Sequence, residues 1–279
     1  MISVLNASVN KFFYEYAESY VTPYERNCCA LMQRILNRDQ SVYVLADADD
    51  ASAVIHGVIA YNKGGSFFHC LPEQDEQVSK AIATFLQTNK LFCITGECSG
   101  TQFVQSIVQQ IDGSKPFEQR DYYLMEHTDN STYKSEGTLK IICCRQKDIN
   151  EVAPLQYMFV EEEVLPKGTV INKSAELILL QKMIAAKKVF AGIAEKKFVA
   201  KIHINAESKR FMQLGGVYTG KEFRGRGFAC QLVTYVTNLV RGKKKQPILF
   251  VNEKNNIAYG VYERVGFTKC GSYRIVYYV

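Results

Sequence analysis

The chain has 279 residues, 47% of them hydrophobic and 22% charged, so it can bury a large core in one or two domains. Its formal net charge of +6 is a mild basic excess, which suits an anionic ligand but does not require nucleic acid. Nine cysteines without a Cys-x-x-Cys pair and four scattered histidines give no metal-ligand spacing. With no signal peptide or membrane-spanning run in the sequence, we expect a cytoplasmic protein with reduced cysteines, no metal and no membrane contact.

The first half of the chain predicts helices alternating with short strands. Apolar residues at steps of three and four indicate helices, and alternating apolar runs bounded by turn residues indicate strands. The expected helices are 9–20, 24–37, 74–88 and 101–111, and the expected strands are 41–47, 53–61, 66–70, 91–97 and 122–127. The polar, turn-rich segment 129–137 then predicts a linker.

The second half predicts a similar succession of elements. The expected strands are 139–145, 188–194, 198–205, 212–219 and 247–252, with a further strand from Phe267. Helices are expected from Asp148, as cap, to about Val164, over 174–186, over 230–240 and after Asn255. The basic run 241–245 falls at a helix end, where cations are favourable, so we interpret it as a solvated helix terminus rather than a nucleic-acid patch.

The segment 223–229, Phe-Arg-Gly-Arg-Gly-Phe-Ala, lies between a predicted strand and a predicted helix. The first N–H groups of a helix have no internal partners and the helix dipole is positive there, which favours phosphate oxygens. Gly225 and Gly227 allow the backbone to approach a pyrophosphate closely, while Arg224 and Arg226 add forked, charged donors. We therefore predict an anion-binding loop here.

Two other phosphate-binding patterns fit this region less well. Gly215 to Lys221 follows most of a Walker A pattern, but Glu222 stands where the magnesium-binding Ser or Thr is needed. A dinucleotide fingerprint beginning at Gly225 would need its third glycine at Cys230, and no strand–helix–strand unit with a ribose-binding acid follows.

The pattern that does fit is Arg-x-x-Gly-x-Gly/Ala, filled by Arg224, Gly227 and Ala229. Downstream, Asn255-x-x-Ala258-x-x-Val261-Tyr262 is followed by Gly266-Phe267. Together, in this order and spacing, the two segments resemble the signatures of GNAT-type N-acetyltransferases. The resemblance implies an α/β (α+β) fold, with a mixed, mostly antiparallel sheet flanked by helices, and acetyl-CoA as co-substrate. Asn255 could cap its helix or bind the pantetheine arm.

The resemblance also implies residue roles. The cofactor site would comprise two backbone segments and the helix-opening asparagine: Val217, Tyr218, Thr219, Arg224, Gly225, Arg226, Gly227, Phe228, Ala229 and Asn255. Tyr262 would be the general acid for the leaving thiolate, since a phenol is protonated at neutral pH. The base is left open, because 212–219 contains no carboxylate; one of the glutamates at 161–163 or a water relay is an alternative.

The acceptor implied by the resemblance is a primary amine of a small molecule or peptide, which would attack the acetyl-CoA thioester directly in a ternary complex. Its identity, and whether the protein is a monomer or a homodimer, stay open. The alternative is a non-catalytic acyl-CoA sensor or regulatory module, which the missing strand carboxylate keeps in consideration and Tyr262 argues against. A nucleic-acid-binding protein is the least favoured class.

The first half follows the same element order as the second, which predicts two tandem GNAT-like domains. The expected boundaries are 1–128 for a degenerate N-terminal domain, 129–137 for the linker and 138–279 for the acetyl-CoA-binding catalytic domain. At the position of the phosphate loop, the first half has no glycine but has Glu73, Asp75 and Glu76. Carboxylates there stabilise a helix N-terminus but repel a pyrophosphate, so we expect no CoA binding in this half.

Overall fold

The computed structural model describes residues 1–128, 139–166 and 168–278. By their contacts these residues divide into unit 1, Met1–Leu124 with Gly271–Val279, and unit 2, Met125–Cys270. The predicted linker, 129–137, lies outside the described residues. The sequence-based boundaries differ from this division at the C-terminus, because the last residues pair with unit 1: Tyr273 to Tyr277 lie antiparallel to Cys93 to Glu97.

Unit 1 is built on a mixed sheet. Its strands run in the order β1 (Ser3–Asn6), β2 (Val42–Ala46), β3 (Ile55–Tyr61), β4 (Ser66–Cys70), β5 (Cys93–Glu97), then β12 (Phe267–Tyr277) and β6 (Glu118–His127), of which the last two also contribute residues to unit 2. The pairs from β1 to β4 are antiparallel, and β4 lies parallel to β5.

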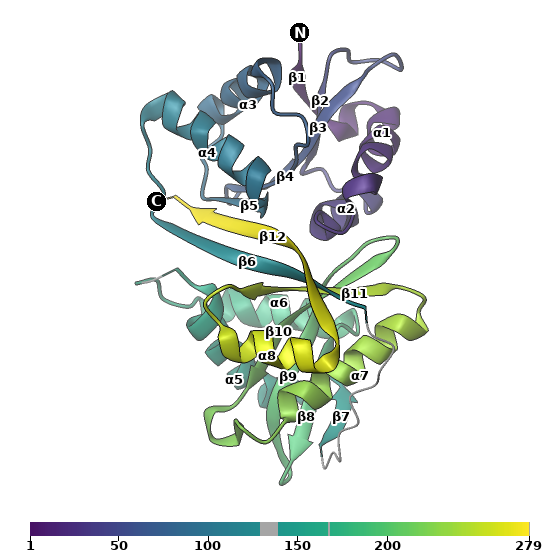
Figure 1. Ribbon diagram of the computed structural model, residues 1–279, viewed down its shortest axis with the longest axis vertical. Helices are drawn as coiled ribbons and strands as arrows, with labels where there is room; N and C mark the ends of the chain where they lie inside the picture. Colours follow the sequence, from purple (N-terminus) through teal and green to yellow (C-terminus); the bar gives the residue numbers. More distant parts are fainter. Residues whose placement is uncertain (129–138, 167, 279) are drawn as a thin grey trace. The chain divides into compact units, whose positions relative to one another are not determined.

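Helices cover both faces of the unit 1 strands. On one face, α1 (Lys11–Val21) and α2 (Cys29–Leu36) share a buried core with Val58, and on the other α3 (Glu76–Thr88) and α4 (Cys98–Asp112) share a core with Ile59 (Figure 1). Successive strand residues point to opposite faces, so the apolar run in β3 serves both cores.

Unit 2 has strands β11 (Gln246–Asn252), β10 (Phe211–Thr219), β9 (Lys197–Glu207), β8 (Val189–Ala194) and β7 (Lys140–Cys143) in that order. Only the β10–β11 pair among these is parallel. Helices α5 (Ile149–Phe159) and α6 (Lys173–Ala185) pack with Val189 and Ala191. The intervening Phe190 faces the other way, toward Tyr235 of α7 (Phe228–Gly242), and α8 (Asn256–Val265) packs on α7.

The structure confirms the predicted α/β class with its mostly antiparallel mixed sheet, and nearly all predicted elements are present. Three details differ. Strand β1 was not predicted, since Ser3–Asn6 is too short for a periodic signal. The predicted helix ending near Val164 is an α-helix only to Phe159 and continues as a π-helical turn, Val160–Val164. Asp148 does not cap α5 with its side chain, because its carboxylate accepts from the Arg145 N–H at 2.8 Å.

Candidate functional site

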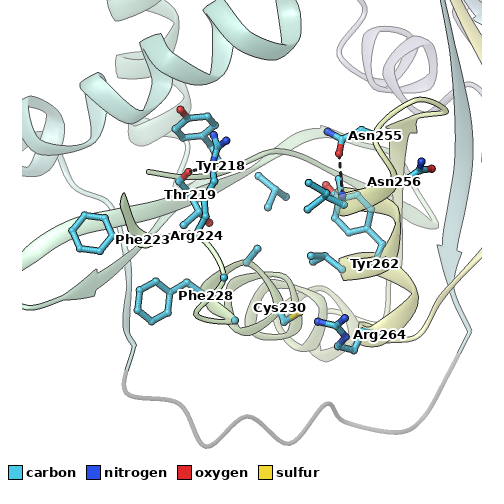
Figure 2. Close-up of a pocket in the computed structure, with 18 of the residues that line it drawn as sticks. Tyr218, Thr219, Phe223, Arg224, Phe228, Cys230, Asn255, Asn256, Tyr262 and Arg264 are labelled. Atoms are coloured by element: carbon cyan, nitrogen blue, oxygen red, sulfur yellow. Dashed lines mark hydrogen bonds between the residues drawn. The ribbon is translucent and has the colours of Figure 1, made fainter. Parts of the chain in front are cut away.

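A cavity of about 690 Å³ opens in unit 2 where strands β10 and β11 separate (Figure 2). The two strands pair in parallel only from Phe211 to Leu214 on β10 and from Gln246 to Leu249 on β11. Beyond this pairing, residues 217–219 of β10 form one wall, and α8 forms the opposite wall. Figure 2 shows Tyr218 on one side of the cavity and Tyr262 on the other.

The start of α7 forms a further part of the wall. Its N-cap residue is Gly227, in the left-handed conformation with φ 75°, and no side chain caps the helix. Gly225 also has positive φ, at 80°, and nothing lies within 4 Å of where its Cβ would be. The first helical N–H groups therefore lack a side-chain acceptor next to an open space, which is the arrangement that binds phosphate oxygens.

The two arginines of the loop are placed differently. Arg224 lines the cavity, where its Nε donates to the Thr219 carbonyl at 3.0 Å and its Nη2 to Glu162 Oε2 at 2.9 Å. Arg226 does not line the cavity; its Nη1 donates to Glu195 Oε1 at 2.8 Å. Both side chains are about half exposed, so each ion pair contributes little to stability.

Glu162 joins the π-helical turn after α5 to the phosphate-loop side of the site. Its Oε1 accepts from the Tyr218 hydroxyl at 2.8 Å and from Lys221 Nζ at 3.1 Å. Partial burial acts to raise the pKa of Glu162, but hydrogen bonds from Arg224, Tyr218 and Lys221 outweigh it and lower that pKa. Burial first, and then the bond to Glu162, raises the pKa of Tyr218 to about 12, so this phenol stays protonated.

The opposite wall is the start and inner face of α8. Asn255 caps the helix, its Oδ1 accepting from the Ala258 N–H at 3.0 Å, and its Nδ2 lies 3.4 Å from Glu163 Oε1. The Tyr262 ring is 8% exposed and packs edge-on to Phe267. Burial, with a smaller contribution from the charge of Glu163, raises the pKa of Tyr262 well above that of a free phenol. Tyr262 is thus held in its protonated form, in which its hydroxyl has a proton to donate.

The cavity brings together ten of the predicted site residues: Val217, Tyr218, Thr219, Arg224, Gly225, Gly227, Phe228, Ala229, Asn255 and Tyr262. It leaves out Arg226. Other lining residues were not predicted as site residues, among them Phe223, Cys230, Asn256, Ile257 and Arg264. Tyr262 and Ala258 are four residues apart and therefore lie on one face of α8, so the sequence could have shown that Ala258 lines the cavity with Tyr262.

Of the three glutamates considered as a base, Glu163 is the one that lines the cavity together with the predicted general acid. Its charge acts on the Tyr262 phenol, whereas Glu162 is held by Arg224. The sequence places residues 161–163 together at a helix end and does not distinguish between them. In the structure they lie in one helical turn, where consecutive side chains point in different directions, so each has different neighbours.

The site's chemistry suits a phosphorylated organic ligand. The uncapped helix start and Arg224 supply anion-binding donors, and Val217, Phe228 and Ala258 supply apolar surface. Within residues 1–128, 139–166 and 168–278, no group of three or more His, Cys, Asp or Glu side chains could hold a metal ion. All nine cysteines are free thiols. No helix in the same ranges is both long and apolar enough to cross a membrane.

Residues 190–276 match the family model described as FR47-like protein. No curated protein matches the chain. Among solved structures, a Drosophila protein has a TM-score of 0.70 at 13% identity, and the match covers 100% of this chain and 98% of the Drosophila chain. A tandem GNAT protein from the clavulanic acid biosynthesis pathway has a TM-score of 0.60 at 7% identity, with 99% and 98% covered.

An acetyltransferase from the GNAT family of Colwellia psychrerythraea has a TM-score of 0.58 at 11% identity, with 94% of this chain and 97% of that chain covered. At these identities the likeness establishes the fold. The resemblance inferred from the two motifs is therefore confirmed: the chain has the fold of the GNAT acetyltransferases, and residues 190–276 match the related FR47-like family.

Proposed function

We propose that this protein is an N-acetyltransferase that uses acetyl-CoA to acetylate a primary amine of a small molecule or peptide. The observation that carries the proposal is the cavity of unit 2, in which an uncapped helix start with two left-handed glycines faces Tyr262 across the diverging strands. The family model and the fold support a transferase of this class.

The residues fit the parts of acetyl-CoA. The N–H groups at the start of α7 and the Arg224 guanidinium would hold the pyrophosphate, because both are donors that line the same cavity. Residues 217–219 at the end of β10 would provide backbone groups and apolar surface for the pantetheine arm. When bound, acetyl-CoA supplies an activated thioester, and the amine attacks it directly.

Two side chains that line the cavity, Tyr262 and Glu163, would carry out the proton transfers. Tyr262 is kept protonated by its burial and would donate its phenolic proton to the departing thiolate. The attacking amine must lose a proton, and Glu163 is the cavity-lining carboxylate that could accept it, directly or through water. The acceptor's ammonium form would also be attracted by the Glu163 charge, which favours a cationic amine.

The test is release of the CoA thiol in the presence of a library of primary amines. An N-acetyltransferase releases thiol in an amine-dependent way and forms an equivalent amount of acetylated amine. The alternative, an acyl-CoA-binding module without turnover, predicts acetyl-CoA binding in calorimetry but no amine-dependent release with any member of the library. Absence of binding would contradict both proposals.

A further inference from the structure

Strand β10 has a bulge opposite Lys201 and His203 of β9. Gly215 pairs with His203 and Tyr218 pairs with Lys201, so two residues of β10 stand opposite one residue of β9. A bulge redirects the side chains that follow it. Here the redirected segment is 217–219, which forms a wall of the cavity.

The first bulged residue, Gly216, is in contact with both side chains. It has φ 58°, and a Cβ at this position would overlap the His203 ring and lie 2.8 Å from Lys201 Nζ. The imidazole and the amine thus fill the space that a side chain at position 216 would need. The bulge and these two side chains form one packed unit, which fixes the course of the strand before it reaches the cavity.

Lys201 is a fully buried amine with few polar neighbours. Its Nζ lies 3.4 Å from His203 Nδ1 and 4.4 Å from the centre of the Phe159 ring on α5. Within the described ranges, no carboxylate lies within ion-pair distance of Lys201 Nζ. An ammonium in this place would lack the charged partner that burial normally requires, so the packing suits the uncharged amine.

The burial of Lys201 outweighs the effect of the charged groups near it. Burial lowers the pKa of Lys201 to about 7, against smaller opposing effects from Glu176 on α6 and Cys144 after β7. Burial, and then the charge of Lys201, lowers the pKa of His203 well below its ordinary value. The residue on α5 that faces the pair is the uncharged Phe159.

We infer that Lys201 and His203 are positioning residues of the proposed cofactor site, because the uncharged Lys201 amine packs under Gly216 and thereby fixes the cavity wall at 217–219. The inference rests on the proposed function and assigns the wall's geometry to a pair of side chains that do not line the cavity. Protonation of Lys201 places a charge beneath the bulge that the surrounding groups do not balance, and the bulge must shift to accommodate it.

This account predicts a specific pH dependence. If only the uncharged amine allows binding, CoA affinity at pH 6 is about tenfold weaker than at pH 8.5 for a group that titrates near pH 7. The sign follows from linkage: the bound form holds one proton fewer than the free form, so binding strengthens as the pH rises through 7.

The experiment is calorimetric titration of CoA into the full-length protein at pH 6, 7 and 8.5, comparing Lys201→Met with Lys197→Met. Lys197 begins the same strand and is exposed, so its variant retains the buried amine. Titration of the CoA phosphates affects both variants equally and cancels. We expect the tenfold loss at pH 6 in the wild type and Lys197→Met, and its absence in Lys201→Met. An equal loss in all three proteins would overturn the inference.

A second measurement does not depend on how the variant folds. In wild-type protein labelled at the lysine side chains, the NMR signal of Lys201 should titrate near pH 7 without CoA and well below pH 7 with saturating CoA. The same midpoint in both conditions would count against the inference. If the wild type binds no CoA at any pH, the proposed function itself fails, which is a separate result.

Discussion

Units 1 and 2 contain the same arrangement of parallel strands joined through a helix, but they use the space between those strands differently. In unit 1, β4 and β5 pair from Ser66 to Phe68 and then diverge, as β10 and β11 do after Leu214 in unit 2. In unit 2 the divergence opens a cavity of about 690 Å³. In unit 1, the side chain of His69 on β4 lies against Gly96 of β5 and Gly100 of α4.

The His69 ring is enclosed by its own unit. Its Nε2 lies 2.9 Å from Thr101 Oγ1, its side chain is buried, and burial lowers its pKa to about 4, so it stays uncharged. Gly96 and Gly100 leave room for the ring, because a Cβ at Gly100 would come within 2.6 Å of it and one at Gly96 would overlap it. The His69 ring thus fills the space beside Gly96 and Gly100 in unit 1, whereas in unit 2 a cavity lies beyond the paired part of β10 and β11.

The helices that join the parallel strands, α3 in unit 1 and α7 in unit 2, also differ at their N-termini. Asp75 caps α3, accepting from the Val78 N–H at 2.9 Å, whereas the N-cap residue of α7 is Gly227, which has no side chain to cap the helix. A carboxylate at the cap satisfies the N–H groups that an anion would otherwise bind. The comparison shows that a few side chains near the strand ends decide whether the same arrangement of strands and helix leaves a cavity open or fills it.

The largest effect is expected from Tyr262→Phe, which removes the proposed acid of the open site. Turnover should fall about 100-fold, within the usual range for general acid catalysis, while acetyl-CoA affinity changes little because only one hydroxyl is lost. Steady-state kinetics and calorimetry measure the two quantities. Equal turnover in the variant and the parent would return Tyr262 to a purely structural role.

The next effects compare a glycine packed against a side chain with a glycine that borders the cavity, through the variants Gly96→Ala and Gly225→Ala. Gly96→Ala forces the His69 ring to move and should lower the free energy of unfolding by about 1–3 kcal/mol without changing CoA affinity. Gly225→Ala meets no atom within 4 Å, so the cost is limited to the left-handed backbone, about 1 kcal/mol, while CoA affinity falls. Denaturant unfolding and calorimetry would detect a reversal of this pattern.

Arg224→Ala should weaken acetyl-CoA binding by up to about tenfold, since it removes a charge-assisted contact with a half-exposed side chain. The matched control is Arg241→Ala, which removes an exposed arginine from the last turn of α7 and should leave the affinity unchanged. Unchanged affinity in a folded Arg224→Ala protein would remove this residue from the phosphate site.

The smallest effect is expected from Glu162→Gln. The Glu162 carboxylate shares Arg224 with the proposed pyrophosphate site, so its removal should strengthen CoA binding by about twofold, as expected for an exposed ion pair. Glu161→Gln, which changes an exposed neighbour by the same charge, serves as control. Weaker binding in Glu162→Gln would mean that the carboxylate instead holds Arg224 in its binding position.

The elements and the loop could be predicted from the sequence because their signals are local. The pattern Arg224-x-x-Gly227-x-Ala229 and the cap at Asn255 are set by the conformations that these residues favour, and the structure places both at one cavity. The segment 73–76 has acids and no glycine, which favours a capped helix start, and Asp75 does cap α3; the lack of CoA binding in unit 1 stays a prediction.

Contacts between distant segments could not be predicted. The ion pair of Arg226 with Glu195, the placement of 271–279 with unit 1 and the packing of Lys201 beneath Gly216 all join residues whose proximity depends on strand order and register. In the sequence, Lys201 and His203 are two residues of an ordinary alternating strand. Only the register with β10 shows that they lie against a bulge.

The central claim is that one of the two similar units binds acetyl-CoA, and it is tested most directly by the stoichiometry of binding. Calorimetric titration of acetyl-CoA into the full chain should give one site per chain, weakened by Arg224→Ala and unaffected by Asp75→Asn in unit 1. Two sites per chain, no binding, or a loss of affinity confined to the Asp75 variant would contradict the account.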